Sequence, residues 1–190
     1  ALPESTDRAG VKLGVFFQNR AMPDVAWLKR QVDAGVLGEP FLAAAQVRWY
    51  RPTEYYSGSR WRGTWALDGG GALMNQGIHT VDLLLWLLGD VTEVHARTRT
   101  ALHDIEVEDT VVATLEFASG ALATLEATTA AYPGFPRRIE LSGTRGTVLL
   151  EDDRVTTVAV EPAPPEPPPA REGNQNASAS SATVADVSEH

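Results

Sequence analysis

The second half of the chain alternates apolar and polar residues in short segments that turn residues separate. A period of two is typical of strands that bury one face. The predicted strands are Val91–Ala101, Glu108–Phe117, Ala121–Ala130, Arg137–Ser142, Thr147–Leu150 and Val155–Val160. Because the joints between them are short and rich in Gly, Pro, Ser and Asp, neighbouring strands are expected to pair antiparallel. A chain with this pattern folds around a sheet.

The first half predicts helices that would cover such a sheet. Pro23 opens a helix that Gly35 ends, and a longer apolar helix runs over residues 72–88. Val11–Phe17 is a mostly apolar run that predicts a buried strand, and Phe41–Tyr50 predicts an alternating one. Helices before a run of strands indicate an α+β fold, with an open, mainly antiparallel sheet covered on one face by helices.

Composition limits the class of protein. The length of 190 residues suits one domain, and 43% apolar residues is typical of a chain that buries a core. A net charge of −9 argues against nucleic acid and against an anionic membrane surface as partners. The absence of cysteine excludes disulfides, zinc–thiolate sites and thiol nucleophiles. No signal peptide or membrane-spanning run is visible, so we expect a cytoplasmic enzyme.

The glycine-rich start of the longer helix carries the strongest candidate site. Gly69–Gly71 precede Asn75 and His79, which lie four residues apart and therefore share one helix face. An imidazole there can take the proton of a substrate hydroxyl while the amide holds that hydroxyl. The glycines would let a ligand approach the backbone, and a helix N-terminus favours anionic groups. The alternative is a tight turn into a core helix with a satisfied histidine, and spacing alone favours neither.

Four further residues are candidates for substrate binding. Trp61 and Arg62, in a long aromatic loop, can offer a stacking face and a forked donor to a sugar, a nicotinamide or a phosphate. Loop packing with a surface ion pair explains them equally well. Arg20 lies between a predicted strand and a helix, where ligands often bind, or it is simply solvated. Tyr132 lies in a predicted turn from which it could reach a substrate.

Other polar residues receive simpler interpretations. Asp82 follows His79 by one turn, so it either orients the imidazole or is a solvated group. His95 and His103 have no partner at metal-ligand spacing, and no metal site is expected. The acidic residues before the first long hairpin are interpreted as a solvated strand end: Glu106, Glu108 and Asp109.

Several blocks of residues, in their order and spacing, resemble the C-terminal half of the Gfo/Idh/MocA oxidoreductases. The blocks are Phe17–Arg20 followed by Pro23, then Gly35–Glu39, Trp61–Gly63, Gly69–Gly89 and Glu106–Thr110, and the resemblance covers residues 9–160. It implies an α+β domain like the C-terminal domain of glyceraldehyde-3-phosphate dehydrogenase. In the family, this domain forms the substrate pocket and commonly the oligomer interface, and it follows a Rossmann domain that binds NAD or NADP.

The resemblance also implies roles for single residues. His79 matches the active-site histidine of the family. Asn75 falls where many members carry aspartate, and relatives that act on nucleotide sugars carry asparagine there. An amide cannot act as a carboxylate base, which leaves His79 and a lysine of the other domain to handle protons. Trp61 and Arg62 match a loop dipeptide that contacts cofactor or substrate.

The glycine-rich dinucleotide loop and the Glu-Lys-Pro segment of the family are absent from the sequence. We therefore expect residues 1–20 to be a remnant of the Rossmann domain, 21–160 the substrate-binding and oligomerisation domain, and 161–190 a flexible linker of Pro, Ser and Ala.

The expected function is that of the substrate-binding domain of an NAD(P)-dependent dehydrogenase. It would act on the CH–OH group of a sugar, nucleotide sugar or polyol, as a homodimer or homotetramer formed through the sheet. The chain alone is expected to bind no cofactor and to be inactive. The alternative is a non-catalytic dimerisation or ligand-binding module that has lost its cofactor domain.

Overall fold

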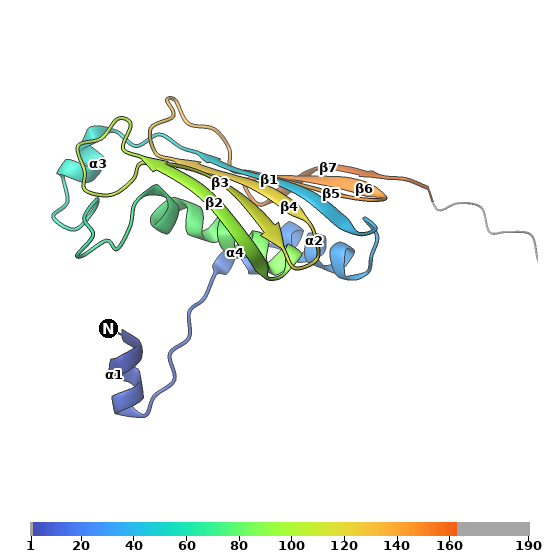
Figure 1. Ribbon diagram of the computed structural model, residues 1–190, viewed down its shortest axis with the longest axis horizontal. Coiled ribbons are helices and arrows are strands. Elements are labelled where there is room, and N and C mark those ends of the chain that lie inside the picture. The colour runs from blue at the N-terminus through green and yellow to red at the C-terminus, as the bar shows by residue number, and fades with distance from the viewer. Residues whose placement is uncertain (1, 163–190) are drawn as a thin grey trace, which may run out of the picture.

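The computed structural model describes residues 2–162, which form one seven-stranded sheet with helices beside it (Figure 1). The strands are β1 (Pro40–Arg48), β2 (Val91–Arg99), β3 (Thr110–Phe117), β4 (Leu122–Thr128), β5 (Arg138–Gly143), β6 (Gly146–Glu151) and β7 (Arg154–Val160). Their order in the sheet is β2-β3-β4-β1-β5-β6-β7, and every pair is antiparallel except β1 with β4. The prediction of an α+β fold with an open, mainly antiparallel sheet is confirmed.

The position of β1 in the sheet differs from the prediction that strands joined by short turns pair with each other. β1 lies between β4 and β5, parallel to the first and antiparallel to the second, so β4 and β5 do not pair with each other. The alternate residues Ala43, Ala45 and Val47 are fully buried, as befits the central strand of the sheet. The short segment that joins β4 to β5 in the sequence does not indicate that β1, from far upstream, lies between them in the sheet.

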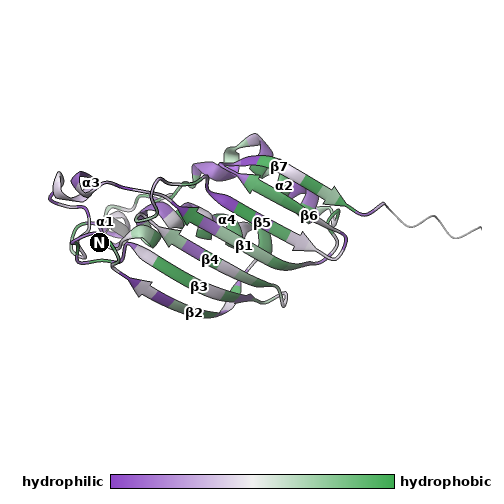
Figure 2. Ribbon diagram, turned by 90° about the horizontal axis from the view of Figure 1, so that it is seen from above, coloured by the Kyte–Doolittle hydropathy of each residue, from purple (hydrophilic) through white to green (hydrophobic). Residues whose placement is uncertain are grey.

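Two helices lie along one side of the sheet, α2 (Pro23–Asp33) and α4 (Ile78–Leu88) (Figure 1). Leu28 of α2 and Leu83 and Leu84 of α4 are buried in one core with alternate residues of the sheet. The smaller helices are α1 (Leu2–Ala9), the 3-10 helix η1 (Gln18–Ala21), α3 (Thr53–Ser57) and the π-helical turn η2 (Leu73–Gly77). Figure 2 shows the sheet with β2 and β7 at its two open edges.

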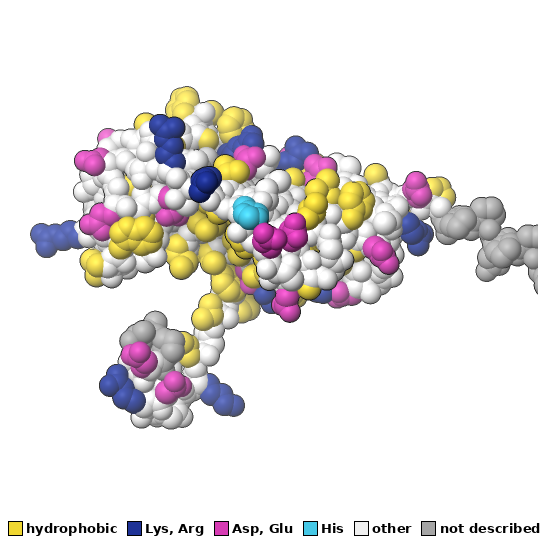
Figure 3. All heavy atoms as spheres, viewed as in Figure 1, with side chains coloured by type: hydrophobic (Ala, Val, Ile, Leu, Met, Phe, Trp, Pro, Cys, Tyr) yellow, Lys and Arg dark blue, Asp and Glu magenta, His cyan; other side chains and the backbone are white. Residues whose placement is uncertain are grey.

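The prediction of a buried strand over Val11–Phe17 is wrong. The segment has no strand in the structure, and it joins α1 to η1 as an extended stretch outside the body of the domain (Figure 1). Most of its hydrophobic side chains are exposed to solvent, with Val15 76% and Phe16 74% exposed (Figure 3). An apolar strand of this kind is buried only when parallel neighbours pair with it and helices cover it, and residues 2–162 offer it neither.

The predicted linker over residues 161–190 lies outside the described residues except for its first two positions. Within residues 2–162, no helix combines the length and the apolar character that crossing a membrane demands.

Candidate active site

A polar cleft of about 430 Å³ opens beside the start of the long helix. Residues far apart in the sequence meet there, because η1, the end of β1, the η2–α4 helix and the β6–β7 turn converge. The lining residues are Gln18, Asn19, Trp49, Arg51, Tyr55, Asn75, Gln76, His79, Arg137, Asp152 and Asp153. The cleft therefore contains Asn75 and His79, the pair that helical spacing predicted to share one face.

The start of the helix is fixed by Glu108, which lies just before β3. Its carboxylate accepts hydrogen bonds from the backbone N–H groups of Gly71 (3.1 Å) and Leu73 (3.0 Å), and its carbonyl oxygen accepts one from Ala72 N–H (2.9 Å). A Cβ atom on Gly71 would lie 1.7 Å from that carbonyl oxygen. Gly71 thus allows the backbone of Glu108 to approach closely, and it does not open space for a ligand. Glu108 caps the helix, so the prediction of a solvated strand end is wrong for this residue.

Asn75 is held in a defined orientation. Its Nδ2 donates a 2.6 Å hydrogen bond to Asp68 Oδ1, while the other oxygen of Asp68 accepts from Gly63 N–H (2.8 Å). Because the NH₂ group is bound to a carboxylate, the carbonyl Oδ1 of Asn75 is the atom left for a ligand. A carboxylate thus lies next to the position where an aspartate was expected from the family pattern.

The imidazole of His79 packs edge-on against the ring of Phe17, with the ring centroids 5.9 Å apart. Its Nδ1 is buried and has no hydrogen-bond partner among the described residues. Asp82 does not bond to this ring. It accepts bonds from Nε and Nη2 of Arg20 at 2.8 and 2.6 Å, and these hydrogen bonds raise the pKa of Arg20. Arg20 also stacks on Trp86, and it is not among the residues that line the cleft.

The loop dipeptide lies at the side of the cleft. The guanidinium carbon of Arg62 is 4.3 Å from the ring centroid of Tyr55 and 4.8 Å from that of Trp61. Tyr55 lines the cleft, whereas Arg62 lines a second cavity of about 380 Å³. Tyr132 is 77% exposed, rests against Tyr50 and does not line the cleft. None of the four predicted substrate-binding residues lines the cleft itself, and Arg62 contacts it only through the ring of Tyr55.

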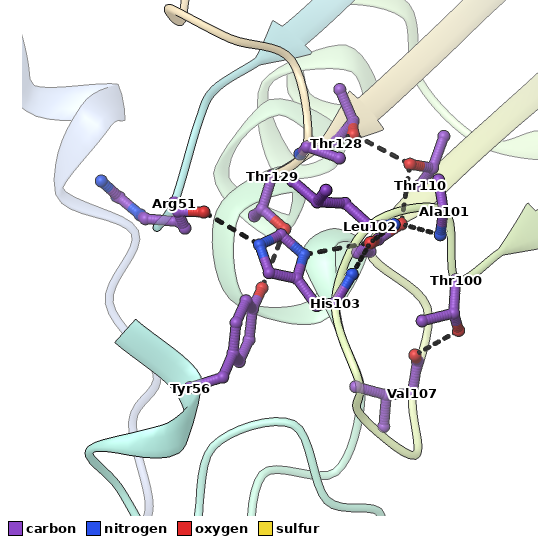
Figure 4. Close-up of polar contacts among 12 residues, drawn as sticks. Arg51, Tyr56, Thr100, Ala101, Leu102, His103, Val107, Thr110, Thr128 and Thr129 are labelled. Atoms are coloured by element: carbon purple, nitrogen blue, oxygen red, sulfur yellow. Dashed lines mark hydrogen bonds and ion pairs between the residues drawn. The ribbon is translucent and has the colours of Figure 1, made fainter. Parts of the chain in front are cut away.

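A buried hydrogen-bond network supports this loop (Figure 4). Asp109 is fully buried and accepts from the N–H groups of Ala101, Leu102 and His103 and from the Thr110 hydroxyl. Burial alone would raise the pKa of Asp109, and these donors outweigh it and lower the pKa to about 2. The interpretation of Asp109 as a solvated group is therefore wrong.

His103 joins that network to the cleft. Its Nδ1 lies 3.0 Å from the Asp109 carboxylate and its Nε2 lies 2.9 Å from the carbonyl oxygen of Arg51, so both ring nitrogens face acceptors (Figure 4). The ring also packs against Tyr56, whose hydroxyl bonds to Thr129 (2.8 Å). His103 is thus a structural residue that positions Arg51, and it is not incidental.

The β6–β7 turn forms another wall of the cleft. Its residues Asp152 and Asp153 were not among the candidates predicted from the sequence. Asp152 and Asp153 both have positive φ angles, 46° and 65°, which non-glycine residues rarely adopt. Asp153 pairs with Arg137 and accepts from Asn19 Nδ2 at 2.6 Å, and Asp152 accepts from Arg137 N–H at 2.9 Å. The only sequence signal was the Asp-Asp pair at a predicted turn, and nothing in it indicated η1 as a partner.

Unpartnered polar atoms concentrate at the cleft. Six buried side-chain polar atoms of the described residues lack a hydrogen-bond partner, and four of them belong to residues that line the cleft. These four are Asn19 Oδ1, Arg51 Nε, Gln76 Oε1 and His79 Nδ1. Buried polar groups are normally paired, so this concentration in the walls of one cleft marks it as the candidate site. Within residues 2–162, no cluster of metal-ligating side chains occurs.

The glycine-rich turn before the long helix does not have the setting of a dinucleotide site. Dinucleotides bind where a glycine-rich turn joins a buried strand to a helix. Gly69–Gly71 follow an irregular loop instead, where Gly71 N–H bonds to the Glu108 carboxylate and Gly69 N–H to the carbonyl oxygen of Thr64. The described residues can therefore provide the substrate side of a reaction that uses a dinucleotide.

The family model of the GFO/IDH/MocA C-terminal domain matches residues 25–149. The chain therefore belongs to the Gfo/Idh/MocA oxidoreductases, as its sequence blocks predicted. Among curated proteins, it is 31% identical over 159 residues to the uncharacterized oxidoreductase YrbE of Bacillus subtilis (81% of this chain, 44% of that protein). It is 29% identical to the myo-inositol 2-dehydrogenase of Thermotoga maritima (83% of this chain, 46% of that protein).

Solved structures agree with this family. The crystal structure of the WlbA dehydrogenase from Bordetella pertussis, in complex with NADH and UDP-GlcNAcA, matches with a TM-score of 0.79 and 38% identity. That match covers 86% of this chain and 48% of the other. The chain thus spans about half the length of the relatives it matches.

Proposed function

We propose that this chain is the substrate-binding domain of an NAD(P)-dependent oxidoreductase that acts on the CH–OH group of a sugar, a nucleotide sugar or a polyol. The observation that carries the proposal is that Asn75 and His79 line one cleft, four of whose lining residues have buried polar atoms without a partner among the described residues. The relatives named as dehydrogenases of inositol, and a structural neighbour solved with NADH and a nucleotide sugar, support this class of substrate.

The two side chains divide the work on the substrate. Asn75 Oδ1 accepts a hydrogen bond from a hydroxyl group beside the reacting one, because one N–H of its Nδ2 is already bound to Asp68. The proton of the reacting hydroxyl passes to the imidazole of His79, and the hydride of the same carbinol carbon would go to the nicotinamide of the cofactor. With Nδ1 buried, Nε2 is the ring nitrogen left for that proton. Trp61 and Arg62 close the side of the site through Tyr55 and border on the cofactor.

The cofactor, NAD or NADP, would be held by a nucleotide-binding domain that residues 2–162 do not contain. The outer face of the sheet is our proposed interface for a homodimer or homotetramer. We also propose a cytoplasmic location for the enzyme, in keeping with a chain that has no cysteine and a net charge of −9.

The substitution His79→Ala in the complete protein tests the proposal. We expect kcat for sugar oxidation to fall roughly 10²- to 10⁴-fold, the usual contribution of a general base. His95→Ala is the matched control, since His95 lies on the exposed strand β2 and pairs only with Glu93. An unchanged kcat for His79→Ala would assign the ring to packing. The 190-residue chain alone, supplied with NAD(P)⁺ and the same sugars, should show no reduction of cofactor; turnover would contradict the need for a second domain.

A further inference from the structure

The imidazole of His79 contacts an aromatic ring where a hydrogen bond would be expected. A histidine that transfers protons is commonly oriented by a carboxylate or a carbonyl oxygen at its other ring nitrogen. Nδ1 of His79 is buried, and it has no such partner within residues 2–162. The ring packs against Phe17 instead, with the centroids 5.9 Å apart and the planes at 83°. This T-shaped contact is directional, so it can fix the tilt of the imidazole.

Phe17 lies at the point where the chain enters the domain. Residues 11–16 are exposed, whereas Phe17 is partly buried. The carbonyl oxygen of Phe17 accepts a 3.2 Å hydrogen bond from Arg20 N–H, which closes the turn of η1. The placement of the Phe17 ring therefore depends on where η1 is held.

η1 is anchored to two different walls of the site. The buried Asn19 donates from Nδ2 to Asp153 in the β6–β7 turn, at 2.6 Å. Arg20 donates from Nε and Nη2 to the two carboxylate oxygens of Asp82 on α4, at 2.8 and 2.6 Å. A two-point bond between a guanidinium and a carboxylate fixes direction as well as distance. The two anchors together therefore hold η1 in one place relative to α4 and the turn.

The second anchor lies on the helix that carries His79. Asp82 comes three residues after His79, so the two side chains leave α4 about one turn apart. The contacts run from Asp82 to Arg20, through η1 to Phe17, and from there back to the imidazole. Asp82 thus makes no bond to the ring, yet it holds the segment that the ring packs against.

We infer that Phe17 is a positioning residue that holds the imidazole of His79, and that the ion pair between η1 and α4 acts on the imidazole through it. The inference rests on the proposed function, because the tilt of the ring matters for turnover only if Nε2 takes the proton of a substrate hydroxyl. Misplacement of a reacting group by about 1 Å can cost roughly 10²-fold in rate, so loss of this contact is measurable.

The substitution Phe17→Leu in the complete protein tests the inference, because leucine keeps the apolar character and removes the ring. We expect kcat for sugar oxidation to fall about 10- to 100-fold, while KM changes by less than about threefold, since the substrate still binds. Phe17→Tyr keeps an aromatic ring and should retain most of the parent's kcat. Phe117→Leu is the matched control, because Phe117 is buried opposite Val91 and does not line the cleft. It should lower stability and leave kcat unchanged.

Nuclear magnetic resonance measures the same contact without turnover. The imidazole signals of His79 are identified by their absence from the spectrum of His79→Ala. They should shift in Phe17→Leu, because the ring current of the phenyl group is lost, and they should keep their position in Phe117→Leu.

Arg20→Lys tests the role of the ion pair. Lysine keeps a charge opposite Asp82 but lacks the fork that fixes direction. We expect the imidazole signals of His79 to shift and kcat to fall, although residue 20 does not contact that ring. In a protein that already carries Phe17→Leu, the same change should cause no further fall in kcat, since both act through one side chain. Additive losses would overturn the route through Phe17.

The inference alone is overturned if Phe17→Leu keeps the parent's kcat, or raises only KM, while His79→Ala loses activity. It is also overturned if the imidazole signals of His79 do not move in Phe17→Leu, or if Phe117→Leu lowers kcat to the same extent. An unchanged kcat in both Phe17→Leu and His79→Ala would overturn the proposed function as well.

Discussion

The contact between Asp68 and Asn75 decides which atom the amide presents to a ligand. Asp68→Asn replaces an obligate acceptor by a side chain that can also donate, so Asn75 is free to rotate its NH₂ group into the cleft. We expect kcat/KM of the complete enzyme to fall about tenfold, the value of one hydrogen bond to a charged group. Asp33→Asn, on the exposed end of α2, should leave it unchanged. Equal kcat/KM for the two variants would show that the orientation of Asn75 does not matter.

The buried carboxylate of Asp109 makes stability depend on acid. Its pKa is lowered to about 2 in the folded state, below the unfolded value of about 3.9. A lowered pKa adds stability above the unfolded value, and this gain is lost as the pH falls through the folded one. Urea unfolding between pH 5 and pH 2 should show a loss of about 2 kcal/mol from this group. Asp109→Asn should be less stable at pH 5 and lack most of this slope; a parallel slope would place the effect elsewhere.

The sequence predicted the residues of the site that lie on one helix and missed those that depend on distant partners. Asn75 and His79 are four residues apart, so helical geometry alone brings them together. Arg51 is fixed in the cleft by a carbonyl bond to His103, which is 52 positions away. The sequence did not predict that Asp82 pairs with Arg20, because the two residues lie 62 positions apart.

At the level of elements, the junction between the glycine turn and the η2–α4 helix is the most tightly constrained. Gly71→Ala places a methyl group within 1.7 Å of the Glu108 carbonyl oxygen, so the helix start or β3 must move. We expect the free energy of unfolding to fall by about 2 to 4 kcal/mol. Gly14→Ala, where no atom lies within 4 Å of the added Cβ, is the control and should change it by less than about 0.5 kcal/mol. A stable Gly71→Ala protein would contradict this account of the turn.

The period-two pattern predicted the strands β2 to β7 to within a few residues. The inner strands β3 to β6 bury alternate side chains on one face, whereas the edge strands β2 and β7 are mostly exposed. The same reasoning could not place β1 between β4 and β5, since strand order is decided by packing over the whole sheet. It was wrong for Val11–Phe17, because an apolar run predicts burial only when something covers it. An apolar pattern thus predicts which side chains tend to be buried. Whether they are buried depends on whether another part of the chain packs against them.

At the scale of the whole molecule, α2 and α4 lie along one face of the sheet, and no helix of residues 2–162 lies along the other face (Figure 1). This open face carries Leu42 and Leu122, paired across β1 and β4, and Val112 on β3, all about half exposed. Thr124 lies among them, opposite Ala44 and Thr114. Exposed apolar side chains of this kind, set among polar ones, favour association with a second copy, in which the same residues meet across a two-fold axis.

Thr124→Lys tests that interface. Two like charges buried near the axis would oppose each other without partners, so sedimentation velocity should show a shift from oligomer to monomer. The fold should persist, because the side chain of Thr124 points to the open face and away from the core. Ser119→Lys, in the exposed β3–β4 turn, adds the same charge outside the sheet and should keep the parent's sedimentation coefficient. If Thr124→Lys sediments as the parent oligomer does, the subunits associate through another surface, and the half-exposed leucines of this face need a different explanation.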